Sequence, residues 1–509
     1  MQYFTQDHEL FRQSLRQFVE KEIVPFIDEW EKQAHIPREI WKKMGEMGYF
    51  GINHAEEYGG TNLDFFFSAV YIEEISRTLA AGFPAAITVH QYMAVAHLAK
   101  AGSHFLKEKY LTPAILGEKI GALAITEPNG GSDVGALRTS ALKEGEEYVI
   151  NGSKTFITNS VYGDFITVAC RTKAGSKGAD GISLIVVDRN TEGLTVNKLD
   201  KMGWNSSDTG EVFFDNVRVP ISHLIGEEGQ GFFYIMESFQ VERLVGALMG
   251  ISGAAHTLEV TLKYASEREA FGKKIQQFQV LRHRIADMAT EIEAAKCLTY
   301  STCWKYINGE YVAKEAAMVK LYASEVGKKV ADECLQFFGG YGFMNDFPIS
   351  RVYRDARVAT IVAGTSEIMR EIIAKIVIDE VKYTSSYQLA GNSEQSSMRA
   401  EKKPETAVEI IRSIPSRFRA EKGGDYTTIV HFDISGEKGG QFTAVIEKGA
   451  CILHEGLLFS PKCLIQAQDS DYADIELGRL NPQAAYMTGK IKVSDIMEMM
   501  QFTKMFRRV

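Results

Sequence analysis

The stretch ALAITEPNGGSD runs from Ala122 to Asp133 and joins an apolar run to a glycine-rich polar turn. It also separates two patterns in the chain. From Gln6 to about Gly117 apolar residues recur at helical spacing, whereas short runs rich in β-branched and aromatic residues follow as far as about Pro220. The stretch therefore marks the change from a helical domain to a β domain.

Two further changes of pattern divide the rest of the chain. Helical periodicity returns after Gly229 and continues to about Ile378. Residues 383–404 are rich in Ser, Gln, Asn, Glu and Lys, so we expect a linker there. Beyond it, strands near 426–434, 441–447 and 451–457 and helices near 406–414, 470–477 and 496–505 predict a small α+β domain. The expected segments are an all-α N-terminal domain (1–119), a middle β domain (120–228), a helical bundle (229–382), the linker (383–404) and the α+β domain (405–509).

The composition excludes several classes of function. The 509 residues include 57 Lys and Arg against 66 Asp and Glu, a formal net charge of −9. Nucleic-acid binding needs clustered basic residues, so no nucleic-acid partner is expected. The six cysteines lie far apart without a CxxC pair, which predicts neither a disulfide framework nor a metal site. Because we find no secretory pattern, no peroxisomal tripeptide and no apolar run of roughly 20 residues, we expect a cytoplasmic protein without a membrane span.

Two glycine-rich loops have the composition of anion-binding sites. In the loop from Thr126 to Asp133, consecutive glycines let backbone N–H groups converge, and Ser132 adds a hydroxyl donor. The sequence GGYG at 339–342 follows a helix that ends near Phe338 and has the same capacity. A plain polar turn is the alternative for the first loop, and a helix C-cap is the alternative for the second.

The helix that follows Gly231 carries one isolated charge on an apolar stripe. Residues 232, 235, 239, 242, 246, 249 and 253 are spaced three and four apart, and Glu242 is the only charged one. Burial among apolar side chains destabilises a carboxylate and raises its pKa toward that of a general base. A structural ion pair with Arg243 or another arginine is the alternative. Gly246 and Gly250 form a GxxxG pattern, which in a soluble protein indicates close helix packing.

Two other motifs have simple structural explanations. In REAFG at 268–272, Arg268 would complement the dipole at the end of the long helix before Gly272 stops it. In AGTSEI at 363–368, the hydroxyl of Thr365 or Ser366 would cap the last bundle helix. These local sequence features thus predict anion-binding loops and one buried carboxylate, but they do not identify a reaction.

Taken together and in order, these segments resemble the acyl-CoA dehydrogenase family over about residues 4–378. The matching motifs are ITEP…GSD at 125–133, NGSKTFITN at 151–159, REAFG at 268–272, Gln336 with Gly339 and Gly340, and AGTSE at 363–367. The resemblance implies an all-α N-terminal domain, a middle β-barrel-like domain and a C-terminal four-helix bundle. It also implies FAD as cofactor, in a homotetramer (a dimer of dimers) where one FAD touches a neighbouring subunit.

The resemblance also implies which residues contact FAD. At the middle domain the flavin would be lined by Leu123, Ile125, Thr126 and Ser132, and its ring would lie beside Phe156, Ile157 and Thr158. An FAD bound mainly to the partner subunit would be held at its pyrophosphate and adenine by Arg268, Phe271, Gln279, Gln336, Gly339 and Gly340. The adenosine portion of FAD would be reached by Thr365 and Glu367.

The implied reaction is α,β-dehydrogenation of an acyl-CoA to the trans-2-enoyl-CoA, in which a carboxylate removes the α-proton. In many family members the catalytic Glu directly precedes Gly-Thr-Ser, but Ala363 occupies that position here. The long-chain and isovaleryl-type branches place the base in a Glu-Arg-Leu segment, which matches residues 242–244. We therefore expect Glu242 to be the catalytic base. The acyl-CoA is expected to contact Ser132, Gln240, Arg243, Ala363 and Gly364.

Residues from about 407 to 509 resemble the sterol carrier protein domain. The matching segments are SDY at 470–472, GRLNPQAAY at 478–486 and GKIKV at 489–493. That family encloses an apolar tunnel for acyl chains, acyl-CoAs or sterols, so we expect a lipid ligand and a long-chain, branched or bulky acyl substrate. Electrons are expected to pass to an electron-transfer flavoprotein. The alternatives are an acyl-CoA oxidase that uses O₂ and a non-catalytic lipid or acyl-CoA carrier.

Overall fold

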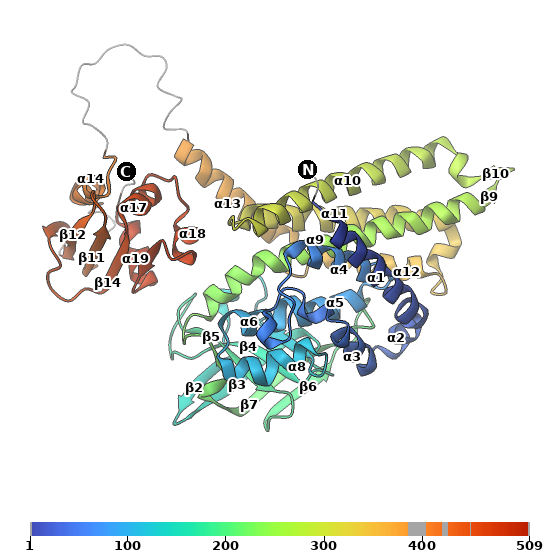
Figure 1. The fold of residues 1–509 in the computed structure, drawn as a ribbon, viewed down its shortest axis with the longest axis horizontal. Coiled ribbons are helices and arrows are strands. Elements are labelled where there is room, and N and C mark those ends of the chain that lie inside the picture. Colours follow the sequence, from blue (N-terminus) through green and yellow to red (C-terminus); the bar gives the residue numbers. More distant parts are fainter. Residues whose placement is uncertain (1–2, 385–403, 420–425, 448, 507–509) are drawn as a thin grey trace, which may run out of the picture. The chain divides into compact units, whose positions relative to one another are not determined.

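A computed structural model describes residues 3–384, 404–419, 426–447 and 449–506 (Figure 1). They divide into two compact units, Met1–Val377 and Ile378–Val509, and each unit is considered by itself. The linker expected at 383–404 lies almost entirely outside the described residues. The predicted order of a helical region, a sheet and a helical bundle, followed by an α+β region, is confirmed.

The first unit begins with short helices. The Asp64 carboxylate accepts a hydrogen bond from the backbone N–H of Phe66 at 2.7 Å, which caps α4. After α5 the chain continues through a π-helical segment, Val89–Ala94, into α6. The helices are α1 (Gln6–Glu22), α2 (Ile27–Gln33), α3 (Arg38–Glu46), α4 (Phe65–Ile75), α5 (Gly82–Thr88), α6 (Ala96–Ala101), α7 (His104–Leu106) and α8 (Thr112–Ile115).

An eight-stranded sheet follows the helices. Its strand order is β6-β7-β3-β2-β4-β5-β8, and β1 pairs in parallel with β4. The pairing of β3 with β7 shifts register between Lys154 and Ile157, so β3 is irregular near its end. The strands are β1 (Gly121–Ala124), β2 (Ser140–Glu144), β3 (Glu147–Thr158), β4 (Phe165–Arg171), β5 (Ile182–Asp188), β6 (Leu194–Lys198), β7 (Thr209–Pro220) and β8 (Leu224–Ile225).

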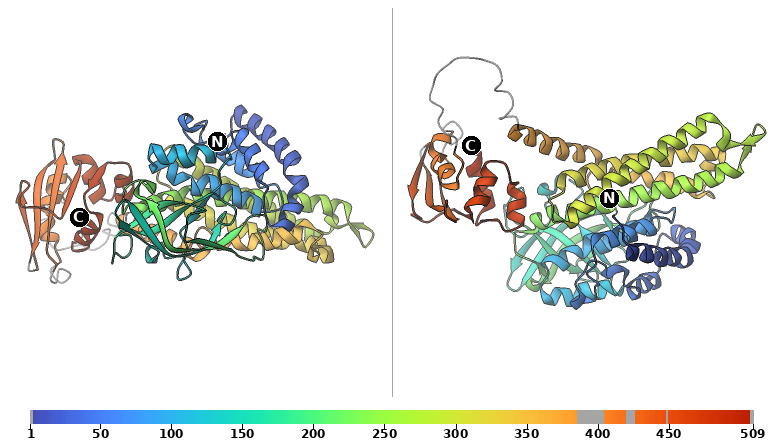
Figure 2. Two further views of the ribbon diagram at one scale, coloured as in Figure 1. Left: turned by 90° about the horizontal axis from the view of Figure 1, so that it is seen from below. Right: turned by 45° about the horizontal axis from the view of Figure 1, so that its top comes forward.

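Long helices complete the first unit (Figure 2). Helix α9 has 37 residues, and a short hairpin connects it to α10. An added Cβ at Gly250 of α9 would lie 3.4 Å from the carbonyl oxygen of Ala323 in α11, so the predicted close packing is confirmed there; at Gly246 it would meet no described atom within 4 Å. The elements are α9 (Gly231–Glu267), β9 (Glu269–Ala270), β10 (Lys273–Lys274), α10 (Gln279–Ile307), α11 (Ala313–Phe338), α12 (Pro348–Ala356) and α13 (Ser366–Thr384).

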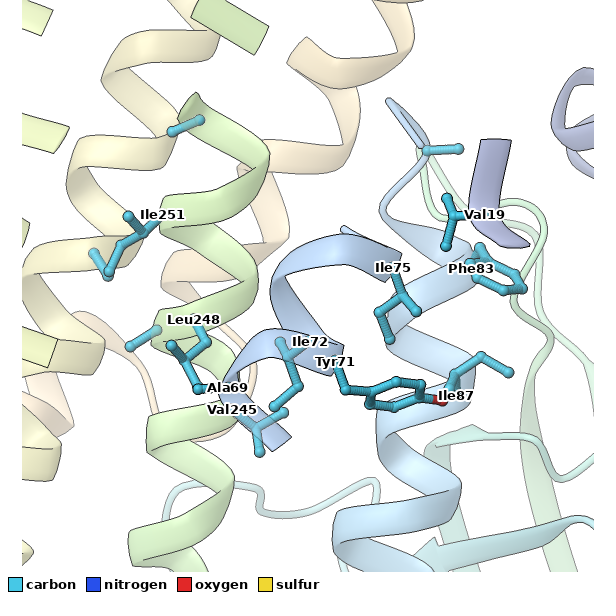
Figure 3. Close-up of a cluster of buried hydrophobic side chains, with 14 of the residues drawn as sticks. Val19, Ala69, Tyr71, Ile72, Ile75, Phe83, Ile87, Val245, Leu248 and Ile251 are labelled. Carbon is cyan, nitrogen blue, oxygen red and sulfur yellow. The ribbon is translucent and has the colours of Figure 1, made fainter. Parts of the chain in front are cut away.

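One apolar core joins the N-terminal helices to the bundle (Figure 3). Tyr71 and Ile72 of α4 lie in this core together with Val245 and Leu248 of α9, and all four are fully buried or nearly so. The core therefore fixes the long helix that carries Glu242 against the first domain.

The second unit contains a five-stranded sheet with the order β13-β12-β11-β14-β15. The three predicted strands and three predicted helices are present, and strands β14 and β15 and helices α15 and α18 were not expected from the sequence. Val430, Phe432 and Ile434 on one face of β11 form the centre of its core. The elements are α14 (Ala407–Arg412), α15 (Ile414–Arg417), β11 (Thr428–Ser435), β12 (Gly440–Glu447), β13 (Ala450–Glu455), β14 (Cys463–Gln468), α17 (Asp469–Glu476), α18 (Pro482–Met487), β15 (Ile491–Val493) and α19 (Ile496–Lys504).

Two general features of the described residues bear on function. None of their helices combines the length and the apolar character needed to cross a bilayer. Nor do they contain a group of three or more His, Cys, Asp or Glu side chains placed to hold a metal ion. All six cysteines carry free thiols.

Replacing Ile72 by Ala should lower the unfolding free energy of the first unit by about 2–5 kcal/mol, because a fully buried side chain is truncated in a packed core. Leu10→Ala is the matched control, since Leu10 is 56% exposed on α1 and its loss should cost no more than about 0.5 kcal/mol. Calorimetry should show the I72A shift in one thermal transition and an unchanged transition for the second unit. Equal shifts for I72A and L10A would contradict the assigned core.

Candidate active site

A buried ion pair joins the glycine-rich loop after β1 to strand β3. The Lys154 ammonium is 0% exposed and donates to a Glu127 carboxylate oxygen and to the carbonyl oxygen of Ile125, both at 2.9 Å. Glu127 also accepts hydrogen bonds from the backbone N–H groups of Arg138 at 2.6 Å and Thr139 at 2.8 Å. The carboxylate thus has partners for both of its oxygens, which a buried charge requires.

This pair places two predicted cofactor segments side by side. The backbone N–H of Thr155 donates to the carbonyl oxygen of Thr126 at 2.9 Å, so the loop lies along β3. Within the loop, the N–H of Gly130 donates to the carbonyl oxygen of Glu127 at 3.0 Å. The predicted convergence of N–H groups on an anion is therefore wrong for Gly130, whose N–H closes the turn. Ser132 lies exposed beyond it, whereas Leu123, Ile125 and Thr126 are half-buried.

The irregular end of β3 turns one aromatic ring outward. Phe156 has φ of +62°, in the left-handed region, and its side chain is 68% exposed. The next side chain, Ile157, is buried in the sheet core, which leaves only its backbone to face a ligand, and Thr158 is half-buried. Asn159 fixes the turn by donating to the carbonyl oxygen of Ala86 at 2.9 Å. An exposed ring held by strain and hydrogen bonds is a feature of a binding surface.

Glu242 lies buried on α9, as the apolar stripe predicts. Its side chain is 5% exposed, and its Oε1 atom has no hydrogen-bond partner among the described residues. Burial raises the pKa of Glu242 to about 7, and the nearby Ser238 hydroxyl and Arg243 guanidinium counter this effect only in part. The Arg243 guanidinium lies 5.6 Å above the ring of Phe239. The described residues give Glu242 no ion pair within 4.0 Å, although the charge of Arg243 is close enough to lower its pKa.

The Gln240 side chain has a structural role. Its Oε1 atom accepts a hydrogen bond from the backbone N–H of Val312 at 2.9 Å, and the side chain is buried. This bond ties α9 to the start of α11. The amide nitrogen of Gln240 and the second lone pair of its oxygen remain available for a contact with acyl-CoA.

The turn before α13 is held by a lysine that the sequence does not single out. Ala363 and Gly364 have φ of +52° and +90°, two consecutive residues in the left-handed region. The Nζ atom of Lys320, on α11, donates to the carbonyl oxygen of Gly364 at 2.5 Å, and this side chain is only 3% exposed. Burial, with a smaller contribution from the nearby Arg243, lowers the pKa of Lys320 to about 8. Lys320 therefore links the turn at Ala363 to the surroundings of Glu242.

A cavity of about 1000 Å³ opens beside this turn. Thr365 caps α13, because its hydroxyl accepts from the N–H of Ile368 at 3.2 Å, whereas the buried hydroxyl of Ser366 has no partner among the described residues. The orphaned hydroxyl and the cations of the lining provide donors for phosphate groups, and its carboxylates provide acceptors for ribose hydroxyls, so the lining suits a dinucleotide such as FAD. The lining consists of Met202, Glu325, Lys328, Lys329, Asp332, Tyr353, Arg357, Thr360, Ile361, Thr365, Ser366 and Glu367.

Asp355 holds one wall of this cavity. It accepts hydrogen bonds from the backbone N–H groups of Trp204 at 2.7 Å and Ala81 at 3.0 Å, which brings together α12, the loop before β7 and the start of α5. Burial raises the pKa of Asp355 to about 7. An isolated Asp on a helix gives no sequence signal for such a role.

The remaining predicted cofactor residues form a second group at the end of the bundle. The guanidinium of Arg268 lies 5.8 Å above the ring of Tyr341, so the β9–β10 hairpin and the GGYG turn are neighbours. Gly339 forms the C-cap of α11, as the structural alternative predicts. Phe271, with φ of +50°, is 96% exposed at the hairpin tip. Figure 1 shows this hairpin at the end of α9 remote from the sheet. Gln279, Gln336, Gly339 and Gly340 are also exposed.

Family comparisons agree with this geometry. The N-terminal, middle and C-terminal domain families of acyl-CoA dehydrogenases match residues 5–118, 122–217 and 229–378. The SCP-2 sterol transfer family matches residues 419–507. Together these four families account for both units of the chain.

Individual relatives extend the comparison. The long-chain specific mitochondrial acyl-CoA dehydrogenase of Rattus norvegicus is 38% identical over 381 residues, which cover 74% of this chain and 88% of the relative. A subunit of the caffeyl-CoA reductase–Etf complex of Acetobacterium woodii is 37% identical over 74% of this chain and 99% of its own. The crystal structure of a probable acyl-CoA dehydrogenase from Mycobacterium abscessus superposes with a TM-score of 0.72 at 42% identity, and covers 74% of this chain and 100% of that one.

The fold and the site define a flavoprotein oxidoreductase. The chain belongs to the acyl-CoA dehydrogenase family, whose members are FAD-dependent, and it carries a C-terminal SCP-2 lipid-binding domain. The predicted family, fusion and cofactor are thereby confirmed.

Replacing Lys154 by Met should cost about 3–5 kcal/mol of unfolding free energy, because it leaves the Glu127 carboxylate buried without its cation. The loop after β1 should loosen from β3, so the purified variant should also retain less FAD. Adding Glu127→Gln removes the uncompensated charge and should restore most of the stability. Chemical denaturation and the flavin content of the purified proteins measure both effects. A K154M variant with wild-type stability and full flavin content would contradict this role.

Proposed function

We propose that this enzyme dehydrogenates an acyl-CoA between its α- and β-carbons, to the trans-2-enoyl-CoA, with Glu242 as the base that removes the α-proton. The observation that carries the proposal is a carboxylate on α9 that is buried and has an oxygen without a hydrogen-bond partner among the described residues. Ala363 has no titratable group, so the base must come from another element.

The surroundings of Glu242 suit proton transfer near neutral pH. Because desolvation raises its pKa to about 7, the carboxylate is both ionised to a useful extent and basic enough to accept a proton. The cations Arg243 and Lys320 lie in the same region and stabilise the negative charge that develops as the α-proton leaves. When bound, FAD accepts the two electrons of the oxidation. The acyl-CoA is proposed to lie against Ser132, Gln240, Arg243, Ala363 and Gly364.

The FAD site is proposed to have two parts from two subunits. One part comprises the loop after β1, the end of β3 and the cavity beside α13, where the contacts are Leu123, Ile125, Thr126, Ser132, Phe156, Ile157, Thr158, Thr365 and Glu367. The other part is the hairpin end of a partner subunit, with Arg268, Phe271, Gln279, Gln336, Gly339 and Gly340. The exposure of Phe271 supports this arrangement, because a large apolar side chain at a strained tip is stabilised by an interface. A homotetramer built as a dimer of dimers would bring the two parts of the FAD site together.

An electron-transfer flavoprotein is the proposed acceptor. The relative from Acetobacterium woodii is named as part of a complex with such a protein, which supports this acceptor over the O₂ of an oxidase. The proposal rests on that likeness. The SCP-2 domain is proposed to bind the acyl chain of a long, branched or bulky ligand in its apolar core region.

Replacing Glu242 by Gln should keep the shape and the bound FAD and remove the base. Anaerobic stopped-flow measurement should show substrate-driven flavin reduction slower by about 10²–10⁴-fold, the usual contribution of a general base. Glu259→Gln is the control, because Glu259 lies on the same helix but is exposed and paired with Arg77. Near-normal reduction in E242Q with normal flavin content would contradict the assignment.

The rate of flavin reduction should rise with pH through a midpoint near 7. The ionised Glu242 is the active form, so protonation below its pKa removes the base and alkaline pH restores it. Single-turnover reduction measured from pH 5.5 to 8.5 at saturating acyl-CoA tests this. The rising limb should vanish in E242Q, and a wild-type rate that falls across this range would be inconsistent with a carboxylate base.

Replacing Phe271 by Ser should weaken both assembly and FAD binding, since the proposed interface carries part of the cofactor site. Sedimentation analysis should show smaller species at low protein concentration, and FAD titration should show a weaker affinity by about tenfold or more for a buried aromatic anchor. Phe105→Ser is the control, an exposed aromatic on another surface. A tetrameric F271S with full FAD affinity would refute the two-part site.

A further inference from the structure

An open space lies beside the proposed base, over Gly246. A Cβ atom added at Gly246 would meet no described atom within 4 Å outside its own helix. Helical side chains lean toward the N-terminus, so the volume that a side chain at 246 would fill lies over the preceding turn, which carries Glu242. The absence of a side chain at Gly246 therefore leaves room next to the Glu242 carboxylate.

Contacts on either side delimit this space. At Met249, the sulfur accepts a hydrogen bond from the hydroxyl of Thr88 on α5 at 3.4 Å. At Gly250, an added Cβ would lie 3.4 Å from the carbonyl oxygen of Ala323 on α11. Viewed down α9, Gly246 lies between these two positions and roughly 40° from Glu242, at 100° per residue. The space is thus flanked by α5 on one side and by α11 on the other.

A second observation indicates that a ligand occupies this space. The Oε1 atom of Glu242 is buried and has no hydrogen-bond partner among the described residues, and a buried carboxylate oxygen without a partner is costly. Because the carboxylate must reach the α-carbon of the substrate, the volume beside it receives whatever is attached to the reacting carbons. An unbranched acyl chain extends from the reacting carbons in one direction only. It therefore has no group that would occupy the volume beside Glu242.

We infer that Gly246 fits this enzyme to acyl-CoAs that carry a substituent on the reacting carbons, so that branched acyl groups are its substrate class. The inference rests on the proposed function and narrows it. The substituent lies over Gly246 between α5 and α11, while the acyl chain continues past it. A larger residue at 246 fills the same volume and excludes the substituent without displacing an unbranched chain.

The test compares Gly246→Val with Gly253→Val. Both glycines have open space at Cβ, but Gly253 lies about three helical turns from Glu242, so G253V is the matched control. Valine is more favourable than glycine inside a helix, so both variants should fold. Each protein is assayed with two acyl-CoAs of equal main-chain length, one unbranched and one with a methyl group on the β-carbon. Calorimetry with the two corresponding 2-enoyl-CoA products gives the binding preference without turnover.

In G246V the ratio of kcat/KM for branched over unbranched substrate should fall by about tenfold or more, the discrimination expected when a methyl group is excluded from a pocket. The binding ratio of the products should fall in parallel, and G253V should retain both wild-type ratios. Unchanged ratios in G246V, or an equal loss for both substrates, would overturn the inference. If no acyl-CoA reduces the wild-type flavin, the proposed function fails, and the calorimetric ratio still decides the role of Gly246.

Discussion

The buried ion pair between Glu127 and Lys154 is the interaction on which the cofactor side of this structure depends. Lys154 belongs to the strand whose end exposes Phe156, and Glu127 belongs to the loop that carries Ser132, so one contact sets the distance between the two surfaces. The pair is stable in the interior because the backbone N–H groups of Arg138 and Thr139 complete the solvation of the carboxylate. The backbone hydrogen bond from Thr155 to Thr126 adds a second link between the loop and β3.

The other side of the proposed active site is formed by α9 and by the turn before α13. The core around Ile72 and Val245 fixes α9 against the N-terminal helices, and this burial is also what raises the pKa of Glu242. On the other side, Lys320 holds the carbonyl oxygen of Gly364. The proposed base can therefore lie on α9, while the turn at Ala363, where the resemblance places a glutamate in many family members, forms another wall of the proposed site. The burial that packs α9 against the first domain is thus also the cause of the raised pKa of Glu242.

Periodicity predicts the parts of the site that lie on regular elements. The apolar stripe on α9 isolates Glu242, and the change of pattern at Ala122 locates the sheet, because both follow from the spacing of side chains. Lys154 and Lys320 could not be found in this way, since a lysine gives no local sign that it is buried and paired with a segment far along the chain. Strands β14 and β15 were missed for a similar reason: β14 pairs with β11 across about thirty residues, and β15 is only three residues long. The GxxxG pattern predicted packing at both glycines, and tertiary placement decided that only Gly250 packs.

The central claim is that this protein uses bound FAD to oxidise an acyl-CoA while a carboxylate on α9 removes the α-proton. The most direct measurement is an anaerobic titration of the purified yellow protein with unbranched, branched and sterol-side-chain acyl-CoAs, followed by its visible flavin absorbance and then by admission of air. The account predicts bleaching by at least one of these classes and slow recovery of colour in air. A flavin that no acyl-CoA bleaches would contradict the dehydrogenase chemistry, and rapid recovery in air with formation of peroxide would contradict the proposed acceptor.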